Sequence, residues 1–401
     1  MNNKFLLNFC LLCIGFSYTI LMKNRIAFGI TLGVGLMVLF FFFKEKLLDE
    51  LKLGLQSLKK LDLFVLLLVS TSGIISSFCS IRIERSIPVL IYLFLFMFLA
   101  TFLYLILRKK NNLKKNLFQL FSISIFFNSI FIFIFNISNY EFGVTAEVIR
   151  FKGYMNILTL LIIVIFYLNK SWVNYISLLT LVPNLLMSNC NAALLGLLIG
   201  LVTYIFYYVS NKFVKPKIIV IIFTLISLFL SVNLIKNLPK KFDKIAIDNF
   251  EFVIPTKLID AHRQFIWGFS IKKFYHKPFF GYGQDTSNFI QGGQKVIGSE
   301  FTGDMTFIPS HPHNFLIELL LDIGLVGLVL FLILILLINI KIWRLNSSIS
   351  LKFFLILFNA YFWGSSLVNF SFWLGWWQGS YYLLLSLIAS QAYKKKLYLN
   401  K

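Results

Sequence analysis

Acidic residues are scarce in this sequence of 401 residues. Asp and Glu number 16 against 38 Lys and Arg, and charged residues of either sign make up only 13% of the chain. In a soluble protein the resulting net charge of +22 would suggest a nucleic-acid partner, but no segment has the composition of a basic folded domain. Nucleic-acid binding is therefore disfavoured.

The motifs of several enzyme classes are also missing. The chain has no DxD, no P-loop, no GxSxG, no HExxH and no GxGxxG. A metal-dependent glycosyltransferase and an ATP-driven pump are therefore disfavoured, and we expect neither a cofactor nor a metal. The four cysteines (Cys10, Cys13, Cys79 and Cys190) lie in or beside apolar segments without metal-site spacing, and only a disulfide between Cys79 and Cys190 is conceivable.

Long apolar runs dominate what is present. Hydrophobic residues make up 58% of the chain and the mean hydropathy is +0.82, which a soluble globule of this length could not bury. The runs are long enough to cross the hydrocarbon core of a bilayer. We predict an all-α polytopic membrane protein, with residues 1–401 forming a single integral membrane domain and the first helix retained. About twelve spans are expected: 5–22, 26–43, 61–79, 88–107, 116–136, 154–168, 172–188, 192–209, 218–235, 314–340, 351–370 and 374–391.

Lysine and arginine clusters predict the orientation of these spans. Basic residues gather in alternate connections, as expected for loops on the cytoplasmic side. Both termini are therefore predicted to be cytoplasmic. The main clusters are Lys44/Lys46/Lys52/Lys59/Lys60, Arg108/Lys109/Lys110/Lys114/Lys115, Lys212/Lys215/Lys217 and Lys394/Lys395/Lys396.

One connection, residues 236–313 between the ninth and tenth spans, is far longer than the others and is predicted on the outer face. It holds all four histidines and seven acidic residues, and loops of this length are usually functional. Within it, residues 257–275 have the pattern of an amphipathic helix that would lie in the headgroup plane. No separate soluble domain is expected.

The stretch from Ser310 to Asn314 enters the tenth span. Pro312 fixes the backbone there, and Asn314 or His313 could cap the helix. His313 is a candidate general base near neutral pH, and Glu318 could orient it. Glu318 and Asp322 share one face of the span, where a carboxylate is usually functional. The alternative makes the histidines solvated loop residues and Glu318 a hydrogen-bond partner between helices.

Four arginines are candidate phosphate ligands, because the planar guanidinium group matches phosphate oxygens. They are Arg82 and Arg85 beside a short outer loop, Arg150 in the 137–153 loop, and Arg263 on the amphipathic helix. Gly281 and Gly283 would let the backbone approach a ligand near Arg263. The alternative for Arg82 and Arg85 is contact with lipid headgroups. The tryptophans of residues 373–377 are expected to form an interfacial aromatic belt.

These motifs together resemble the bacterial O-antigen ligase family and its relatives, the O-antigen polymerases. The resemblance rests on His311-x-His313-Asn314-x-x-Ile317-Glu318 followed by Gly324-x-x-Gly327 at the start of a helix after a long outer loop. It is supported by the Arg263 helix leading into Lys277-Pro278-Phe279-x-Gly281-x-Gly283, by Arg150-Phe151 before a helix, and by the order of about twelve spans.

The resemblance implies a reaction and roles for its residues. A ligase moves a glycan from undecaprenyl pyrophosphate to a sugar hydroxyl of lipid A-core at the periplasmic face of the inner membrane, without metal or nucleotide. By position, His313 would deprotonate the acceptor with support from His311 and Glu318. Arg263, Arg150 and Arg82 or Arg85 would bind the pyrophosphate. One departure is Asn191, which stands where ligases usually carry an arginine.

Two alternatives remain beside the ligase. A polymerase would join repeat units on the same carrier. A lipid-linked glycan flippase or transporter would need charge through the midplane and paired halves, which the sequence does not show. The acceptor sugar, the glycan repeat and the choice of base between His311 and His313 are left open by the sequence.

Overall fold

The computed structural model describes residues 3–56, 59–139, 151–213, 222, 226, 229, 231–298 and 302–391. Within these residues the fold is helical, and its only extended pairing is an isolated bridge between Val296 and Thr306. The helices are α1 (Asn3–Leu21), α2 (Arg25–Gln56), α3 (Lys60–Phe78), α4 (Ile83–Lys109), α5 (Asn111–Asn139), α7 (Lys152–Leu168), α8 (Trp172–Met187), α9 (Asn191–Phe213), α11 (Lys244–Asp248), α12 (Ala261–Phe274), the 3₁₀ turn η1 (Ser287–Phe289), α13 (Phe315–Asp322), α14 (Gly324–Arg344), α15 (Ile349–Ser366) and α16 (Gly375–Ala389).

The predicted class, an all-α polytopic membrane protein, is confirmed. Seven of the described helices (α1 to α5, α9 and α14) are long and apolar enough to cross a membrane, and α7 and α8 are shorter apolar helices. Each predicted span except the ninth coincides with described helix, and most of 218–235 lies outside the described residues. The number of crossings and the cytoplasmic position of the termini stay predictions.

The membrane helices pack around one large core to which α1, α2, α4, α5, α7, α15 and α16 contribute. Buried hydrogen bonds between helices reinforce it, as is usual where apolar packing alone gives little specificity in lipid. The hydroxyl of Tyr154 donates to the carbonyl of Tyr18 at 2.9 Å, and Asn128 donates to the Tyr154 oxygen at 2.9 Å. The Tyr361 hydroxyl likewise donates to Asn156 at 2.8 Å. These bonds tie α1, α5, α7 and α15 together.

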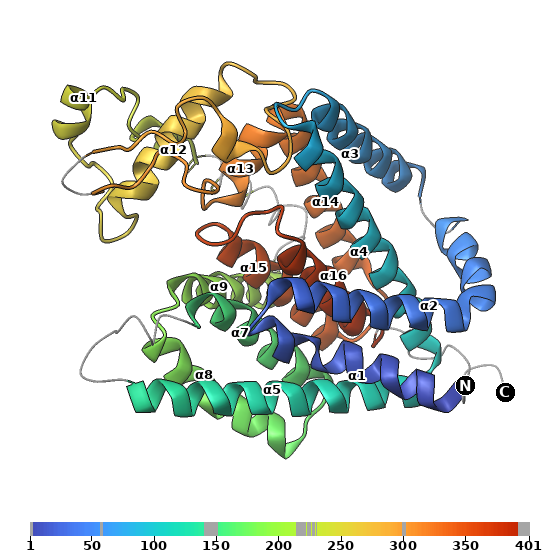
Figure 1. The fold of residues 1–401 in the computed structure, drawn as a ribbon. Coiled ribbons are helices and arrows are strands. Elements are labelled where there is room, and N and C mark those ends of the chain that lie inside the picture. The colour runs from blue at the N-terminus through green and yellow to red at the C-terminus, as the bar shows by residue number, and fades with distance from the viewer. Residues whose placement is uncertain are drawn as a thin grey trace.

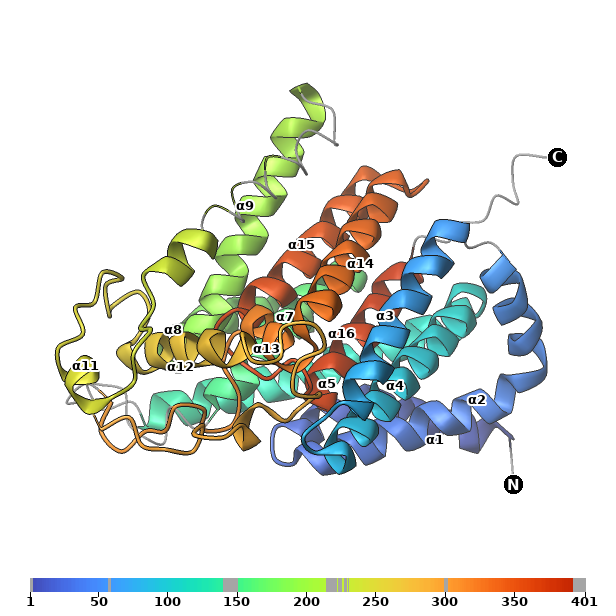
Figure 2. The same ribbon diagram turned by 90° about the horizontal axis from the view of Figure 1, so that it is seen from above.

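The long loop gathers at one end of α9, α14 and α15, as the yellow and orange segments of Figures 1 and 2 show. It has a small core of its own, in which Phe265 and Phe269 of α12 pack against Phe307, Ile308 and other loop residues. The rings of Phe269 and Phe307 stack with centroids 4.8 Å apart. The loop is therefore a packed unit on top of the membrane helices.

Helix α12 is shorter and more enclosed than residues 257–275 predicted. Asp260 is the N-cap residue: its side chain accepts a hydrogen bond from the Arg263 amide at 2.8 Å, so the helix begins at Ala261. Every residue from Gln264 to Ser270 is buried. The apolar residues of this stretch thus face protein, and α12 lies against α13.

The predicted span 314–340 is broken at Ile323–Gly324 into α13 and α14. Gly324 has a φ of +70°, which glycine adopts without strain. The loop satisfies the freed backbone groups: the amides of Tyr282 and Gly283 donate to the Leu321 and Asp322 carbonyls at 3.0 and 2.8 Å. The Leu325 amide donates in turn to Pro278 at 2.8 Å. The predicted span is therefore made of two helices instead of one.

Gly281 and Gly283 serve this same contact. A Cβ on Gly281 would lie 2.5 Å from the Asp322 carbonyl oxygen, and one on Gly283 would lie 2.0 Å from the Ser80 hydroxyl. Both glycines also have positive φ. They allow the loop backbone to approach α13 and the α3–α4 turn, rather than a ligand as the sequence suggested.

Gly324→Ala should destabilise the protein strongly, because its Cβ would meet the Phe279 carbonyl oxygen at 2.2 Å in addition to the positive φ. Gly298→Ala is the matched control: its φ is +73° and nothing lies within 4 Å of the added Cβ. We expect about 1–2 kcal/mol of backbone strain in the control and a clearly larger loss at Gly324. Thermal unfolding in detergent measures both losses. Equal losses would show that the clasp, which residues 278–283 form around the α13–α14 break, does not contribute to stability.

Candidate active site at the entrance to α13

His311 and His313 lie together where the loop enters α13. Their ring centroids are 4.1 Å apart, and the His313 amide donates to His311 Nδ1 at 3.1 Å. The backbone here is specially held: His313 has a φ of +55°, and the Trp267 indole donates to the Pro312 carbonyl at 2.8 Å. Asn314 then caps α13 by accepting from the Leu316 and Ile317 amides at 3.0 and 3.2 Å, as the sequence predicted for Asn314 or His313.

The hydrogen bonds distinguish the two rings. Nδ1 of His313 lies 3.4 Å from the Asn369 carbonyl oxygen, which can only accept, so Nδ1 carries the proton and Nε2 is the basic nitrogen. Nδ1 of His311 accepts from the His313 amide, so it is unprotonated and its proton is on Nε2. The pair therefore offers one ring that can accept a proton through Nε2 and one that can donate through Nε2.

Both histidines are neutral at neutral pH. Burial, together with the smaller effects of the neighbouring His313 and Arg263, lowers the pKa of His311 to about 3. Burial also lowers the pKa of His313 from its ordinary value, with the Arg263 charge as the next cause. Arg263 thus stands within electrostatic reach of both rings. Its guanidinium group pairs with Asp260 at 3.0 Å and keeps a side-chain exposure of 34%, so it can still meet a ligand.

Glu318 is buried and reaches the histidines only through another segment. Its carboxylate accepts from the Ser371 hydroxyl at 2.5 Å and from the Phe372 amide at 2.7 Å. Residues 369–373 also provide the Asn369 carbonyl that faces His313. Glu318 therefore anchors the segment that positions His313. The alternative stated for it, a hydrogen-bond partner between helices, describes its contacts better than direct orientation of the ring.

Asp322 holds the other end of α13. It accepts from the Ser287 hydroxyl at 2.6 Å and from the Trp373 indole at 2.7 Å. Sequence reasoning missed Asn369, Ser371 and Trp373, because nothing in their spacing links them to α13. The tryptophans of 373–377 were wrongly expected to form an aromatic belt: Trp373, Trp376 and Trp377 are all buried.

Arg82 and Arg85 form a second group near the C-terminal end of α13. Both guanidinium groups lie over the Phe289 ring, with centroid distances of 5.0 and 5.1 Å. Arg85 pairs with Asp285 at 2.9 Å, in the same loop segment whose backbone contacts Asp322. Arg263 is thus associated with the start of α13, and Arg82 and Arg85 with its end. These ends are roughly 12 Å apart, because the helix has eight residues.

The remaining predicted residues contribute less. Arg150 lies outside the described residues. Asn191 begins α9 and is exposed, and the Cys190 thiol before it donates to the Lys152 carbonyl at 3.2 Å. All four cysteines are free, so the Cys79–Cys190 disulfide does not form. Within the described part of the chain, no three His, Cys, Asp or Glu side chains gather as metal ligands would.

An apolar cavity of about 300 Å³ lies next to this region, between α3, α4 and α14. Gln284 lies at one end, close to the Arg85–Asp285 pair in sequence. Asp62 and Lys341 lie at the other end and form an ion pair of 2.7 Å. The lining follows α3 from Asp62 to Gly73, roughly 16 Å along the helix. The cavity is therefore narrow and runs along three helices that can cross a membrane.

Fold and site together define a polytopic membrane protein with two paired, half-buried histidines and an arginine near an apolar cavity. Residues 176–332 match the profile of the O-antigen ligase family. This range includes Arg263, His311, His313 and Glu318 but not Arg82 or Arg85. The resemblance seen in the motifs is therefore confirmed for this part of the chain.

Curated relatives agree with this match. The chain is 31% identical over 197 residues to a candidate polysaccharide ligase of Rickettsia conorii, covering 48% of this chain and 45% of that protein. It is 30% identical over 232 residues to one of Rickettsia typhi, covering 56% of this chain and 53% of that protein. The chain thus spans about half the length of the curated relatives it matches.

The site makes a prediction about pH. Because burial and Arg263 hold the pKa of His313 below its ordinary 6.5, an activity that needs the neutral ring should keep its plateau when the pH falls through 6.5 and decline only further into acid. Arg263→Gln removes a positive charge that opposes protonation, so the pKa of both rings should rise towards 6.5 without reaching it. Histidine NMR titration of the purified protein measures this independently of activity. Arg82→Gln is the control and should leave both titrations unchanged; equal shifts in the two variants would contradict the assigned geometry.

Proposed function

We propose that this protein is an O-antigen ligase, which transfers a glycan from undecaprenyl pyrophosphate to a sugar hydroxyl of lipid A-core. We place the reaction at the periplasmic face of the bacterial inner membrane, with both termini cytoplasmic. The observation that carries the proposal is the neutral His313, with Nε2 as its basic nitrogen, beside Arg263 within the region that matches the ligase family. The proposed enzyme needs no metal or nucleotide, because the donor already carries a pyrophosphate leaving group.

In this reaction the acceptor hydroxyl attacks the anomeric carbon of the donor glycan. The new carbon–oxygen bond forms as the bond to the pyrophosphate oxygen breaks, and the hydroxyl proton passes to Nε2 of His313. The Asn369 carbonyl stabilises the resulting imidazolium through Nδ1–H, as a fixed acceptor at the far side of the ring. His311 remains neutral because of its low pKa, and its Nε2–H can donate to a substrate oxygen.

The leaving pyrophosphate gains negative charge, which Arg263 is placed to stabilise. Its guanidinium group would exchange part of its bond to Asp260 for phosphate oxygens, and a bidentate contact suits this shape. Arg82 and Arg85 are less suited to bind the pyrophosphate, since they already contact Phe289, Glu84 and Asp285 near the other end of α13. Arg150 stays a proposed ligand on sequence grounds alone.

The apolar cavity between α3, α4 and α14 supports a lipid-linked donor. Its narrow shape along the membrane helices suits a single hydrocarbon chain. The Gln284 end lies towards the loop and would place the headgroup end of the chain on the side of the catalytic residues. The Asp62–Lys341 pair would close the opposite end.

The proposal is tested in bacteria that lack their own ligase and are supplied with the matching O-antigen. Wild type should restore lipopolysaccharide ladders on a gel, and His313→Ala should lose them, with activity lower by about 10²–10⁴-fold for a missing general base. His276→Ala is the matched control, because His276 is an exposed histidine of the same loop. Both variants must reach the membrane at wild-type levels.

Other results of this experiment would assign the protein differently. If wild type restores no ladder but lengthens the carrier-linked glycan, the protein is a polymerase. If His313→Ala restores ladders as well as His276→Ala does, the assigned base is wrong.

The cavity gives a second test. Val69→Trp on α3 would fill the cavity and exclude the lipid chain, so glycan transfer at a fixed donor concentration should fall several-fold. Leu67→Trp is the control, because Leu67 is 57% exposed on the outside of the same helix. Transfer from a donor with a shortened lipid, measured with purified protein in detergent, should suffer less from Val69→Trp. Equal transfer by the two variants would show that the donor chain does not enter the cavity.

A further inference from the structure

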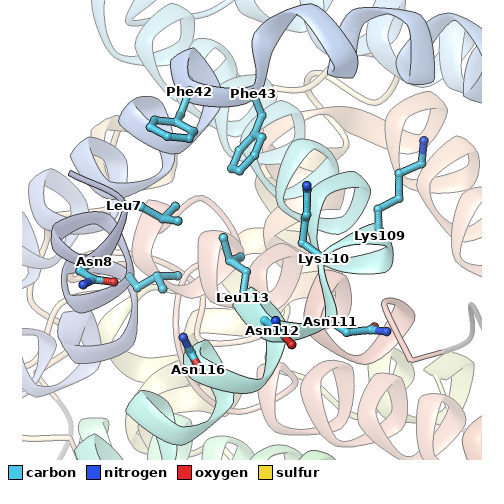
Figure 3. Close-up of a pocket in the computed structure, with 11 residues that line it drawn as sticks. Leu7, Asn8, Phe42, Phe43, Lys109, Lys110, Asn111, Asn112, Leu113 and Asn116 are labelled. Carbon is cyan, nitrogen blue, oxygen red and sulfur yellow. The ribbon is translucent and has the colours of Figure 1, made fainter. Parts of the chain in front are cut away.

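A second pocket lies far from the histidines, where α1, α2 and the α4–α5 turn meet (Figure 3). Its volume is about 600 Å³. One part of its wall is apolar and consists of Leu7, Leu11, Phe42, Phe43 and Leu113. Phe42 and Phe43 come from neighbouring positions on α2, while Leu7 and Leu113 come from α1 and α5. The pocket therefore depends on three separate helices as well as the α4–α5 turn.

The other part of the wall is polar and positively charged. Lys109 and Lys110 end α4, and Asn8, Asn112 and Asn116 line the side below them in Figure 3. The lysines and these asparagines are all exposed. The acidic residues nearest to these polar residues in sequence are Glu84 and Glu141, each 25 positions away. The polar wall thus offers ammonium and amide donors without an acidic group among its lining residues.

The position of the pocket indicates where it meets its surroundings. Leu7 is in the first turns of the apolar helix Lys4–Leu21, and Phe43 is at the end of the apolar stretch Arg25–Lys44. The α4–α5 turn separates the apolar helices Ile83–Lys109 and Asn111–Asn139. Thus α1 and α5 begin, α4 ends and the apolar part of α2 ends at the pocket, which places it at the boundary between hydrocarbon and water. The basic clusters predict that this boundary is the cytoplasmic one.

We propose that this pocket binds an anionic phospholipid of the cytoplasmic leaflet. The phosphate would lie against Lys110 and the asparagine amides, and the upper part of an acyl chain would lie against Phe42, Phe43 and Leu113. Basic pockets between membrane helices on the cytoplasmic side suit such headgroups. A soluble anion would satisfy Lys110 but would leave the aromatic wall without a partner, which favours the lipid.

The bound lipid would link helices that are distant in sequence. It would contact α1, α2 and α5 at the point where the chain reverses between α4 and α5, so its binding should stabilise their packing. This role does not depend on glycan transfer and concerns the opposite end of the molecule from His313.

The test compares lipid binding to the purified full-length protein in detergent by native mass spectrometry. The probes are phosphatidylglycerol and phosphatidylcholine with the same acyl chains. Wild type should prefer phosphatidylglycerol, and Lys110→Ala should weaken its binding by about fivefold. Lys115→Ala is the matched control, because Lys115 is an exposed lysine on α5 that does not line the pocket. Phe42→Ala should weaken binding of both lipids.

Each other outcome would overturn the proposal. Equal losses in Lys110→Ala and Lys115→Ala would reveal general attraction between a basic surface and anionic lipid. No preference between the two lipids would exclude recognition of the anionic headgroup. Binding of glycerol 3-phosphate as tight as that of phosphatidylglycerol would show that the pocket takes a soluble anion. Thermal unfolding of each variant without lipid checks that the fold is intact.

Discussion

The clasp of the long loop around the α13–α14 break is the constraint on which the site depends. A helix that is interrupted inside the protein exposes amide and carbonyl groups, and each must find a partner. The segment from Pro278 to Gly283 provides those partners on both sides of Gly324. Because the loop is fixed at this point, α12 is held against α13, and Arg263 is brought within reach of His311 and His313.

Buried carboxylates connect this clasp to the C-terminal segment. Glu318 and Asp322 lie one turn apart on α13, and both receive hydrogen bonds from residues 371–373. Burying such groups is costly unless their bonds are satisfied, so the 369–373 segment is fixed in one position. The carbonyl that faces His313 belongs to the same segment. The buried carboxylates of α13 thus fix the segment that positions the His313 ring.

Local pattern predicted the helices and the histidine pair, but not the contacts between distant segments. Apolar length gave the spans, and the proline and asparagine around His313 gave the capped entrance to α13, because both depend on neighbouring residues alone. The break at Gly324 could not be predicted from local pattern, since the residues that stabilise it, 278–283, lie more than forty positions before it in sequence. The partners of Glu318 were hidden for the same reason: Ser371 is 53 positions away.

The loop core and the membrane core are separate clusters of side chains. Leu321 of α13 belongs to the loop core, while Phe315 and Leu319 of the same helix pack with α4 and the residues around Trp373. One short helix thus contributes side chains both to the loop core and to a cluster of the membrane helices. During evolution, the outer surface of the loop can diversify while the membrane helices stay unchanged, provided that α13 is retained. Natural variation should accordingly concentrate in the coil around α11 and be lowest along α13.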